Sequence, residues 1–148
     1  MGHSAGATHV ATYLFHKEAT PEKERWPRAG DGVVGGILLS GWYDPATAAN
    51  VAVSRAYFGD DASLYPARAS VRQVAARKVP VFIGFAEYDP PGFQIEAANL
   101  FKAICERDQR CPPMKQLIGH NHMTEIYHLG TKDASISTDL VEFVKRAR

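Results

Sequence analysis

The sequence has 148 residues, of which 45% are hydrophobic and 22% are charged, and this composition is typical of one soluble globular domain. Its 17 basic and 16 acidic residues leave a net charge of +1, with no basic patch to attract nucleic acid or an anionic membrane. No apolar run approaches the roughly 20 residues that span a bilayer. Because no basic leader with an apolar core opens the sequence, we expect a cytoplasmic protein without a membrane span.

Helices and short apolar strands alternate along the chain. Apolar residues at i, i+3, i+4 and i+7 predict a helix from Ala5 to about Lys17. The charged, proline-broken stretch that continues to Gly32 predicts a loop. The nearly continuous apolar run Val33–Ser40 predicts a strand buried on both faces, as in a parallel sheet.

The second half of the chain repeats this alternation. Two more strands are predicted, one over the apolar part of Val79–Pro91 and a shorter one that begins at Met114. Helical turns are predicted over Ala46–Tyr57 and Val71–Arg77, with a loop over 58–66 between them. Two longer helices are predicted, with these inward residues: Ala97, Phe101, Ile104 and Cys105 in Gln94–Arg107, and Ile136, Leu140, Val141 and Val144 in the helix from about Ala134. The order predicts the α/β class, with a parallel sheet of about three strands flanked by helices and joined by right-handed crossovers.

The two cysteines, Cys105 and Cys111, do not form the C-x-x-C pair of a zinc or redox motif. They could close a short loop as a disulfide in an oxidising compartment. Because no export signal is evident, we expect two free thiols, one of them on the buried face of a helix.

The chain opens with the pentapeptide GHSAG, from Gly2 to Gly6, directly before the first predicted helix. G-x-S-x-G marks a sharp strand-to-helix turn that exposes its serine above a sheet, with glycines relieving the crowding. Ser4 is therefore a candidate nucleophile, and the N–H of Ala5 is a candidate oxyanion donor. The alternative is that Ser4 is a plain helix N-cap.

A serine nucleophile needs a base and a group that orients the base. On this architecture the acid and then the histidine follow the serine along the chain. Asp89 lies just past the second predicted strand, and His122 lies just past the third. Since parallel strands end at one edge of a sheet, the three side chains are expected to meet there.

With these residues in place, the chain resembles the C-terminal half of α/β-hydrolase carboxylesterases, in the broad esterase and lipase group that includes hormone-sensitive-lipase-like enzymes. The matching stretches are GHSAG, GILLSGWYDP, PVFIGFAEYDPPGFQIEAANLF and LIGHNHMTEIYHLG. The resemblance implies a partial α/β-hydrolase fold and a small-molecule ester as substrate, without a cofactor. It implies Ser4 as nucleophile, His122 as general base and acid, and Asp89 as the residue that orients His122.

Rival residues exist for the acid and the base. Asp44 follows the first strand and could supply the acid, although an aspartate before proline also forms turns. Glu87 is expected to be a loop charge. His120 competes with His122, but the pattern of a glycine, two variable residues, the histidine and an apolar residue favours His122.

The remaining histidines and aromatic residues have plainer expected roles. His9, His16 and His128 are expected at the surface or satisfied by hydrogen bonds, and His3 fills a variable position of the turn. A metal site built from His120, His122 and His128 is not expected, because no companion acidic or cysteine ligand is recognisable. Trp42 and Tyr43 follow a strand end, where they would either line a substrate pocket or simply pack.

Enzymes of this architecture usually fill about 200–250 residues. We therefore expect residues 1–148 to form a truncated domain that lacks the N-terminal strands, the strand entering the turn at Ser4, and the loop with the second oxyanion donor. The apolar edge of Val33–Ser40 would then be open to self-association. An inactive truncated or pseudo-enzyme module is the alternative to an esterase, and an amidase or arylformamidase is the alternative within enzymes.

Overall fold

The computed structural model describes residues 1–16, 32–48 and 52–147, and all but the two ends of the loop predicted over His16–Gly32 lie outside them. Four strands alternate with helices along the chain. The strands are β1 (Gly2–His3), β2 (Gly36–Leu39), β3 (Val81–Ala86) and β4 (Met114–Leu117). The helices are α1 (Ala5–Phe15), α2 (Ala52–Phe58), α3 (Tyr65–Arg68), α4 (Ser70–Gln73), α5 (Pro91–Asp108), α6 (Thr124–Tyr127) and α7 (Ser137–Arg146), with short 3₁₀ turns at Pro45–Ala48, Ala62–Leu64 and Val74–Ala76.

The four strands form one parallel sheet in the order β1-β2-β3-β4, which confirms the α/β class. The expectation that no strand enters the turn at Ser4 is wrong, because Gly2 pairs with Leu38 and His3 pairs with Leu39. Two residues suffice, since the extended chain before Ser4 lies directly against β2. Among the described residues β2 is paired on both sides, by β1 and β3, so the expectation that the strand in Val33–Ser40 has an open edge is wrong.

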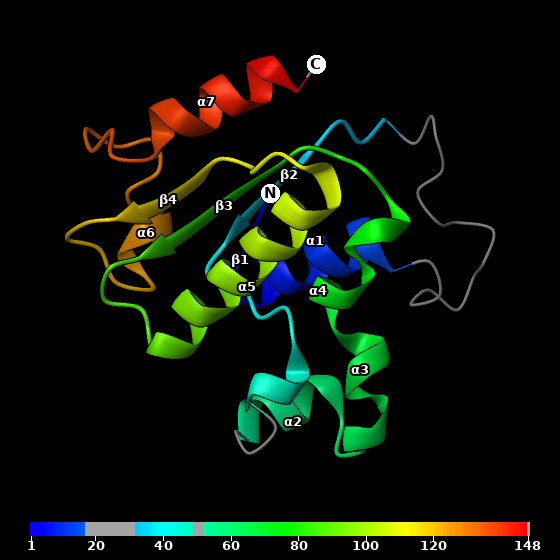
Figure 1. The fold of residues 1–148 in the computed structure, drawn as a ribbon. Coiled ribbons are helices and arrows are strands. Elements are labelled where there is room, and N and C mark those ends of the chain that lie inside the picture. Colours follow the sequence, from blue (N-terminus) through cyan, green and yellow to red (C-terminus); the bar gives the residue numbers. More distant parts are fainter. Residues whose placement is uncertain (17–31, 49–51, 148) are drawn as a thin grey trace.

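Helices cover both faces of the sheet (Figure 1). On one face α1 and α5 pack on the strands through small and aliphatic residues such as Ala7, Ala11 and Leu100, each of which is fully buried. On the other face α7 packs through Ile136 and Leu140. The small residues of α1 let this helix approach the sheet closely. Ser4 lies directly between β1 and α1, where the strand layer meets the helix layer.

Several elements differ from the sequence prediction. Val141 and Val144 were expected to point inward, yet they are exposed, because Phe143 fills that side of α7 against the sheet. The region 58–66 contains helical turns rather than a plain loop. Of the helix predicted over Ala46–Tyr57, residues 49–51 lie outside the described part of the chain.

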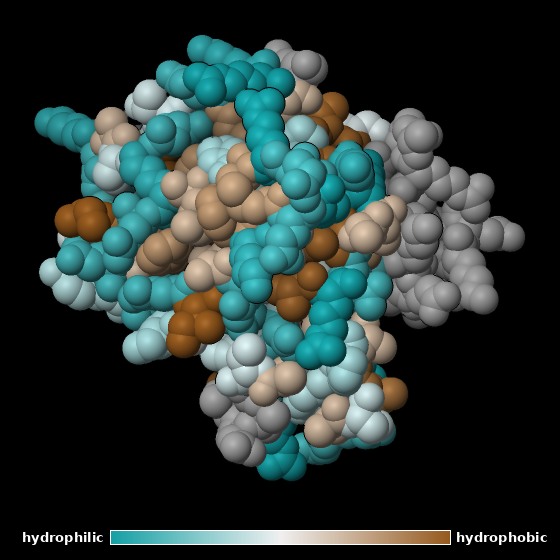
Figure 2. Space-filling view, in the orientation of Figure 1, coloured by the Kyte–Doolittle hydropathy of each residue, from teal (hydrophilic) through white to brown (hydrophobic). Residues whose placement is uncertain are grey.

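Most of the apolar side chains exposed at the surface lie among polar ones on the face that Figure 2 shows. On the face shown in Figure 2, strongly hydrophobic residues are scattered among hydrophilic ones. In the part of the chain that the structure describes, no helix combines the length and the apolar character that crossing a membrane requires.

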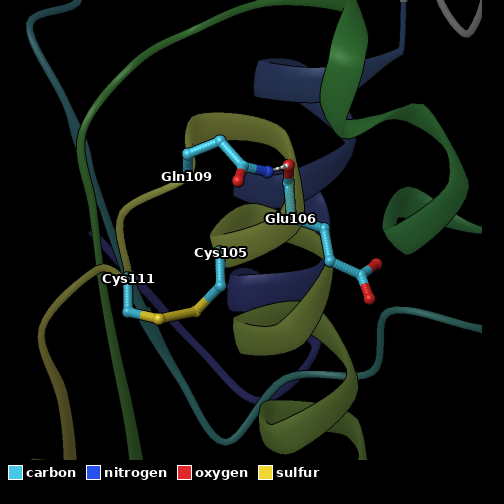
Figure 3. The surroundings of a disulfide bond; sticks show 4 residues. All are labelled: Cys105, Glu106, Gln109 and Cys111. Atoms are coloured by element: carbon cyan, nitrogen blue, oxygen red, sulfur yellow. Dashed lines mark hydrogen bonds between the residues drawn. A yellow bond between two sulfur atoms is a disulfide. The ribbon is translucent and has the colours of Figure 1, made fainter.

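Cys105 and Cys111 form a disulfide (Figure 3), so the expectation of two free thiols is wrong. Cys105 lies in the last turns of α5, and the chain reverses at Gln109, which adopts a left-handed backbone with φ of 52°. The side-chain amide of Gln109 donates to the carbonyl oxygen of Glu106 at 2.8 Å. This reversal brings the two cysteine Cα atoms to 4.2 Å, a proximity that cysteine spacing alone does not reveal.

The disulfide should contribute only modestly to stability, because it closes a loop with a sequence separation of six residues. Replacing Cys105 and Cys111 by serine is expected to lower the free energy of unfolding by about 2 kcal/mol, the loop-closure entropy of so short a loop. Urea unfolding with and without reductant measures this difference. Reductant should lower the free energy of unfolding of the wild type to that of the variant, and it should leave the value of the variant unchanged. An unchanged free energy of unfolding of the wild type in the presence of reductant would contradict the prediction.

Candidate active site

The candidate site lies where the parallel strands end. Ser4 follows β1, Ser40 follows β2, Asp89 lies three residues past β3, and His122 lies in the loop after β4. Because all strands run the same way, their carboxyl ends share one edge of the sheet. Residues as far apart in sequence as Ser4 and His122 therefore meet.

The turn at Ser4 is strained. Its φ of 54° lies in the left-handed region, which non-glycine residues rarely adopt. The turn is held because the Ser4 N–H donates to the Leu39 carbonyl at 2.9 Å, while the Ser4 carbonyl accepts from the N–H of Ala7 at 3.0 Å. Strained backbone that surrounding bonds hold in place is a recurrent feature of functional sites.

The two glycines of the pentapeptide are not equivalent. A Cβ on Gly2 would lie 2.2 Å from the carbonyl oxygen of Gly6, an impossible approach. A Cβ on Gly6 would meet nothing within 4 Å. The crowding expected of both glycines is therefore confined to Gly2.

The structure brings Ser4, His122 and Asp89 into one hydrogen-bonded chain. His122 Nε2 lies 2.8 Å from Ser4 Oγ, and His122 Nδ1 lies 2.7 Å from Asp89 Oδ1. The Asp89 side chain is fully buried, whereas that of His122 is 23% exposed. A buried carboxylate behind a partly accessible imidazole, itself facing a serine hydroxyl, is an arrangement that can transfer a proton from the serine.

Asp89 is held by donors that sequence reasoning missed. Its Oδ2 accepts from Ser40 Oγ at 2.5 Å and from the Ala86 N–H at 2.7 Å. Ser40 is fully buried and, like Ser4, has a left-handed φ, of 47°. In the sequence, Ser40 directly follows the predicted strand in LLSGW. This position could have indicated a role in the site, because residues at the carboxyl ends of parallel strands lie at one edge of the sheet.

The rival residues lie elsewhere or have other partners. Asp44 Oδ1 accepts from the Ala46 N–H at 2.9 Å, so Asp44 forms the turn that was its alternative role. Glu87 is more than a loop charge, because its carboxylate accepts from the Gly119 N–H at 2.7 Å and so holds the loop after β4. His120 is buried beside Asp133 and Ser135.

The imidazole of His122 contacts two other rings. Phe93 stacks on it with ring centroids 4.6 Å apart and an interplanar angle of 29°. The ring of His3 lies 4.7 Å away at 41°. Trp42 packs edge-on against Phe93 at 5.1 Å, so Trp42 borders the site, whereas Tyr43 is 1% exposed and belongs to the core.

His3 joins the turn at Ser4 to the loop that carries His122. Its Nε2 lies 2.7 Å from the His122 carbonyl oxygen, which it meets as a hydrogen-bond donor, and 3.0 Å from Glu125 Oε1, which it meets as an ion-pair partner. The Glu125 carboxylate is fully buried and has no aligned hydrogen-bond donor among the described residues. A buried carboxylate is stabilised by a compensating charge, which His3 supplies when its ring is protonated.

The His3–Glu125 pair should make stability depend on pH. The interaction with Glu125, which outweighs the opposing effect of burial, raises the pKa of His3 above 6.5. The stabilisation is therefore fully present below about pH 6.5, where unfolded histidine is protonated, and is lost as the pH rises through the raised pKa of the folded state. Glu125→Gln is expected to lower the pKa of His3 and flatten this slope, as NMR titration and urea unfolding at a series of pH values would measure.

His16 provides an internal check on that measurement. Burial lowers the pKa of His16, so its contribution has the opposite sign and is lost as the pH falls. That contribution is the same in wild type and variant and cancels in their difference. An unchanged His3 pKa in Glu125→Gln would contradict the assigned pairing.

Ala5 is the first residue of α1 and is exposed. The first N–H groups of a helix have no carbonyl partner within the helix. The N–H of Ala5 is one of these, and it directly follows Ser4. This is the position from which the expected oxyanion donor would act.

Two clusters of the described residues bring together possible metal ligands. The first is His3, His122 and Glu125, and the second is His120, His128 and Asp133. In the first, both nitrogens of His122 already face Ser4 and Asp89, so that ring has no lone pair to spare. The set of His120, His122 and His128 weighed from the sequence is not brought together, because His122 turns away from the other two rings.

Comparison with known proteins identifies the fold. No family model matches the sequence, and no curated protein matches it. The structure is similar to that of a carboxylesterase from Lactobacillus plantarum, with 19% identity and a TM-score of 0.66 over 98% of this chain and 56% of that one. It is also similar to a thermophilic esterase from Thermogutta terrifontis with propionate bound, with 14% identity and a TM-score of 0.63 over 99% of this chain and 52% of that one.

The esterase 2 of T. terrifontis, phosphoramylated by tabun, matches with 15% identity and a TM-score of 0.62 over 99% of this chain and 50% of that one. At these identities the likeness shows the fold alone. The chain therefore has part of the α/β-hydrolase fold and spans about half the length of these esterases.

Proposed function

We propose that this protein is a serine hydrolase that cleaves carboxylic esters through an acyl-enzyme intermediate, with Ser4 as nucleophile. The observation that carries the proposal is the chain of contacts from Ser4 Oγ to His122 Nε2 at 2.8 Å and from His122 Nδ1 to Asp89 Oδ1 at 2.7 Å. Geometry and roles, rather than sequence position, identify such a triad. The strained turn at Ser4 and the fold of the similar esterases support it.

In the proposed acylation step, Ser4 Oγ attacks the ester carbonyl carbon while His122 Nε2 takes the hydroxyl proton. Asp89 keeps the other proton of the ring on Nδ1 and stabilises the imidazolium that forms. The Ala5 N–H donates to the oxyanion of the tetrahedral intermediate. Collapse of this intermediate breaks the bond to the alcohol, which leaves with the proton that His122 returns.

In the second half of the cycle, His122 takes a proton from water, which attacks the acyl carbon on Ser4. The ester bond to the serine then breaks, and His122 returns the proton to Ser4 Oγ. The stacking of Phe93 and the contact with His3 hold the imidazole in one orientation through both halves. Holding reacting groups in place is a major source of catalytic rate.

Phe93, which stacks on His122, and Trp42, which packs against Phe93, make the surroundings of His122 apolar and favour an ester with an apolar part near that ring. The T. terrifontis esterase is described with propionate and also with butyrate bound. We therefore propose short aliphatic acyl esters as the first substrates to test.

The location of the protein in the cytoplasm is a prediction from the sequence.

The experiment has two readouts on the same chain. A fluorophosphonate probe is expected to label wild type at Ser4, located by mass spectrometry, and not to label Ser4→Ala. Hydrolysis of p-nitrophenyl propionate and butyrate by wild type is expected to disappear in Ser4→Ala. Labelling without turnover would support an assembled triad but refute ester hydrolysis by this chain. Absence of both in a folded protein would favour the non-catalytic module.

A further inference from the structure

The segment between β4 and α7, on either side of α6, holds a second cluster of side chains, apart from Ser4. His120 Nε2 lies 3.2 Å from Asp133 Oδ2, and His128 Nδ1 lies 3.0 Å from the same oxygen. The ligand atoms of these three residues all lie within 4.8 Å of one another. Asp133 is the acidic companion that sequence spacing did not reveal.

We propose that His120, His128 and Asp133 form a binding site for a divalent transition metal ion, and that this ion is zinc. The ligand atoms would be His120 Nε2, His128 Nδ1 and Asp133 Oδ2. Two imidazoles and one carboxylate form a donor set typical of zinc sites that keep an open position.

The separations from Asp133 Oδ2 to the two histidine nitrogens are close to those of a zinc site, and the two nitrogens lie within 4.8 Å of each other. Zinc bonds to histidine nitrogen and carboxylate oxygen are about 2.0–2.1 Å long, so tetrahedral geometry sets ligand atoms about 3.3–3.4 Å apart. The observed separations of 3.2 and 3.0 Å need only a slight expansion to admit the ion. The rings of His120 and His128 are nearly perpendicular, at 80°, with centroids 5.2 Å apart, so they approach Asp133 Oδ2 from different directions.

The surroundings orient the carboxylate for this role. Asp133 Oδ1 accepts from the Ser135 N–H at 2.8 Å, which leaves Oδ2 facing the two histidines. The hydrogen bonds from Ser135, followed by that from His128, lower the pKa of Asp133, so the ligand is ionised. Such contacts from outside the ligand set are what hold metal ligands in position.

Burial divides the site into an inner and an outer side. The His120 side chain is 7% exposed, whereas those of His128 and Asp133 are 47% and 31% exposed. His120 therefore anchors the site to the protein, and the outer side admits the ion and leaves a position for water. Metal binding would tie the end of β4 to the turn before α7 and so fasten the loop that carries His122.

The test is metal binding by the intact, tag-free protein, and it does not depend on ester hydrolysis. Calorimetry is expected to show one equivalent of Zn²⁺ bound, Co²⁺ should give the visible absorption of a tetrahedral complex, and Zn²⁺ should raise the melting temperature. His128→Asn and Asp133→Asn should each weaken binding by more than about 100-fold, beyond the effect typical of residues outside the ligand set.

Matched variants separate this site from the other cluster. Glu125→Gln, which alters the His3–His122–Glu125 cluster, and His9→Asn, at an exposed position, should bind Zn²⁺ like wild type. His128 is exposed enough that its variant should fold, which circular dichroism would check. Absence of stoichiometric binding, or binding that survives both His128→Asn and Asp133→Asn, would overturn the proposal. Loss of binding in Glu125→Gln alone would assign the ion to the other cluster.

Discussion

Asp89→Asn is expected to lower the rate of fluorophosphonate labelling at Ser4, and kcat for ester hydrolysis, by about 10⁴-fold, the cost of the wrong histidine tautomer in such triads. The local contacts explain why. Ser40 Oγ–H and the Ala86 N–H both donate to Oδ2, so an asparagine would place its carbonyl oxygen there. Its NH₂ group would then face His122 Nδ1, and the ring proton would move to Nε2, which must be free to accept from Ser4.

The matched control is Asp44→Asn, at the rival acid. Because Asp44 accepts from the Ala46 N–H, while the ring of His122 meets Asp89 and Ser4 instead, the Asp44 variant should keep the labelling rate within a few-fold of wild type. The opposite pattern, a large loss in Asp44→Asn and little in Asp89→Asn, would move the acid to Asp44. Equal small losses in both would remove the carboxylate from the proposed mechanism.

Gly2→Ala is expected to lower the free energy of unfolding by about 3 kcal/mol, a loss typical of strained backbone and overpacking. The added Cβ would lie 2.2 Å from the Gly6 carbonyl oxygen and 2.4 Å from its carbon, and neither atom belongs to a flexible side chain. To relieve the clash, β1 must move away from α1, which disturbs the turn at Ser4. Urea unfolding measures the loss.

Gly6→Ala provides the matched comparison within the same pentapeptide. A Cβ there meets nothing within 4 Å, and alanine favours a helix over glycine. Gly6→Ala is therefore expected to be neutral or to stabilise by about 0.5 kcal/mol. Similar destabilisation by both variants would contradict the view that only Gly2 lies in a crowded position.

Some features of the candidate site were accessible from the sequence. Ser4, Asp89 and His122 each follow an apolar run, and parallel strands end at one edge, so their approach to one another was predictable from order alone. His122 could be preferred over His120 only by a motif, since both lie in the same loop. Their different surroundings, Ser4 for one and Asp133 for the other, follow from how the loop folds after β4.

Other contacts are not fixed by any local pattern, even where a residue's position at a strand end, as for Ser40, places it near the site. The bond between Ser40 and Asp89 joins residues 49 apart. The Cys105–Cys111 disulfide depends on the left-handed backbone of Gln109, which thiol spacing does not indicate.

The sequence by itself determined the α/β class and the order of the candidate residues at the strand ends, because hydrophobic periodicity and turn residues act locally along the chain. Only the tertiary structure decided that two residues before Ser4 suffice for a strand, that His3 pairs with Glu125, and that His120, His128 and Asp133 converge. These depend on pairing partners distant in the sequence and on side-chain directions in loops, which no local pattern encodes.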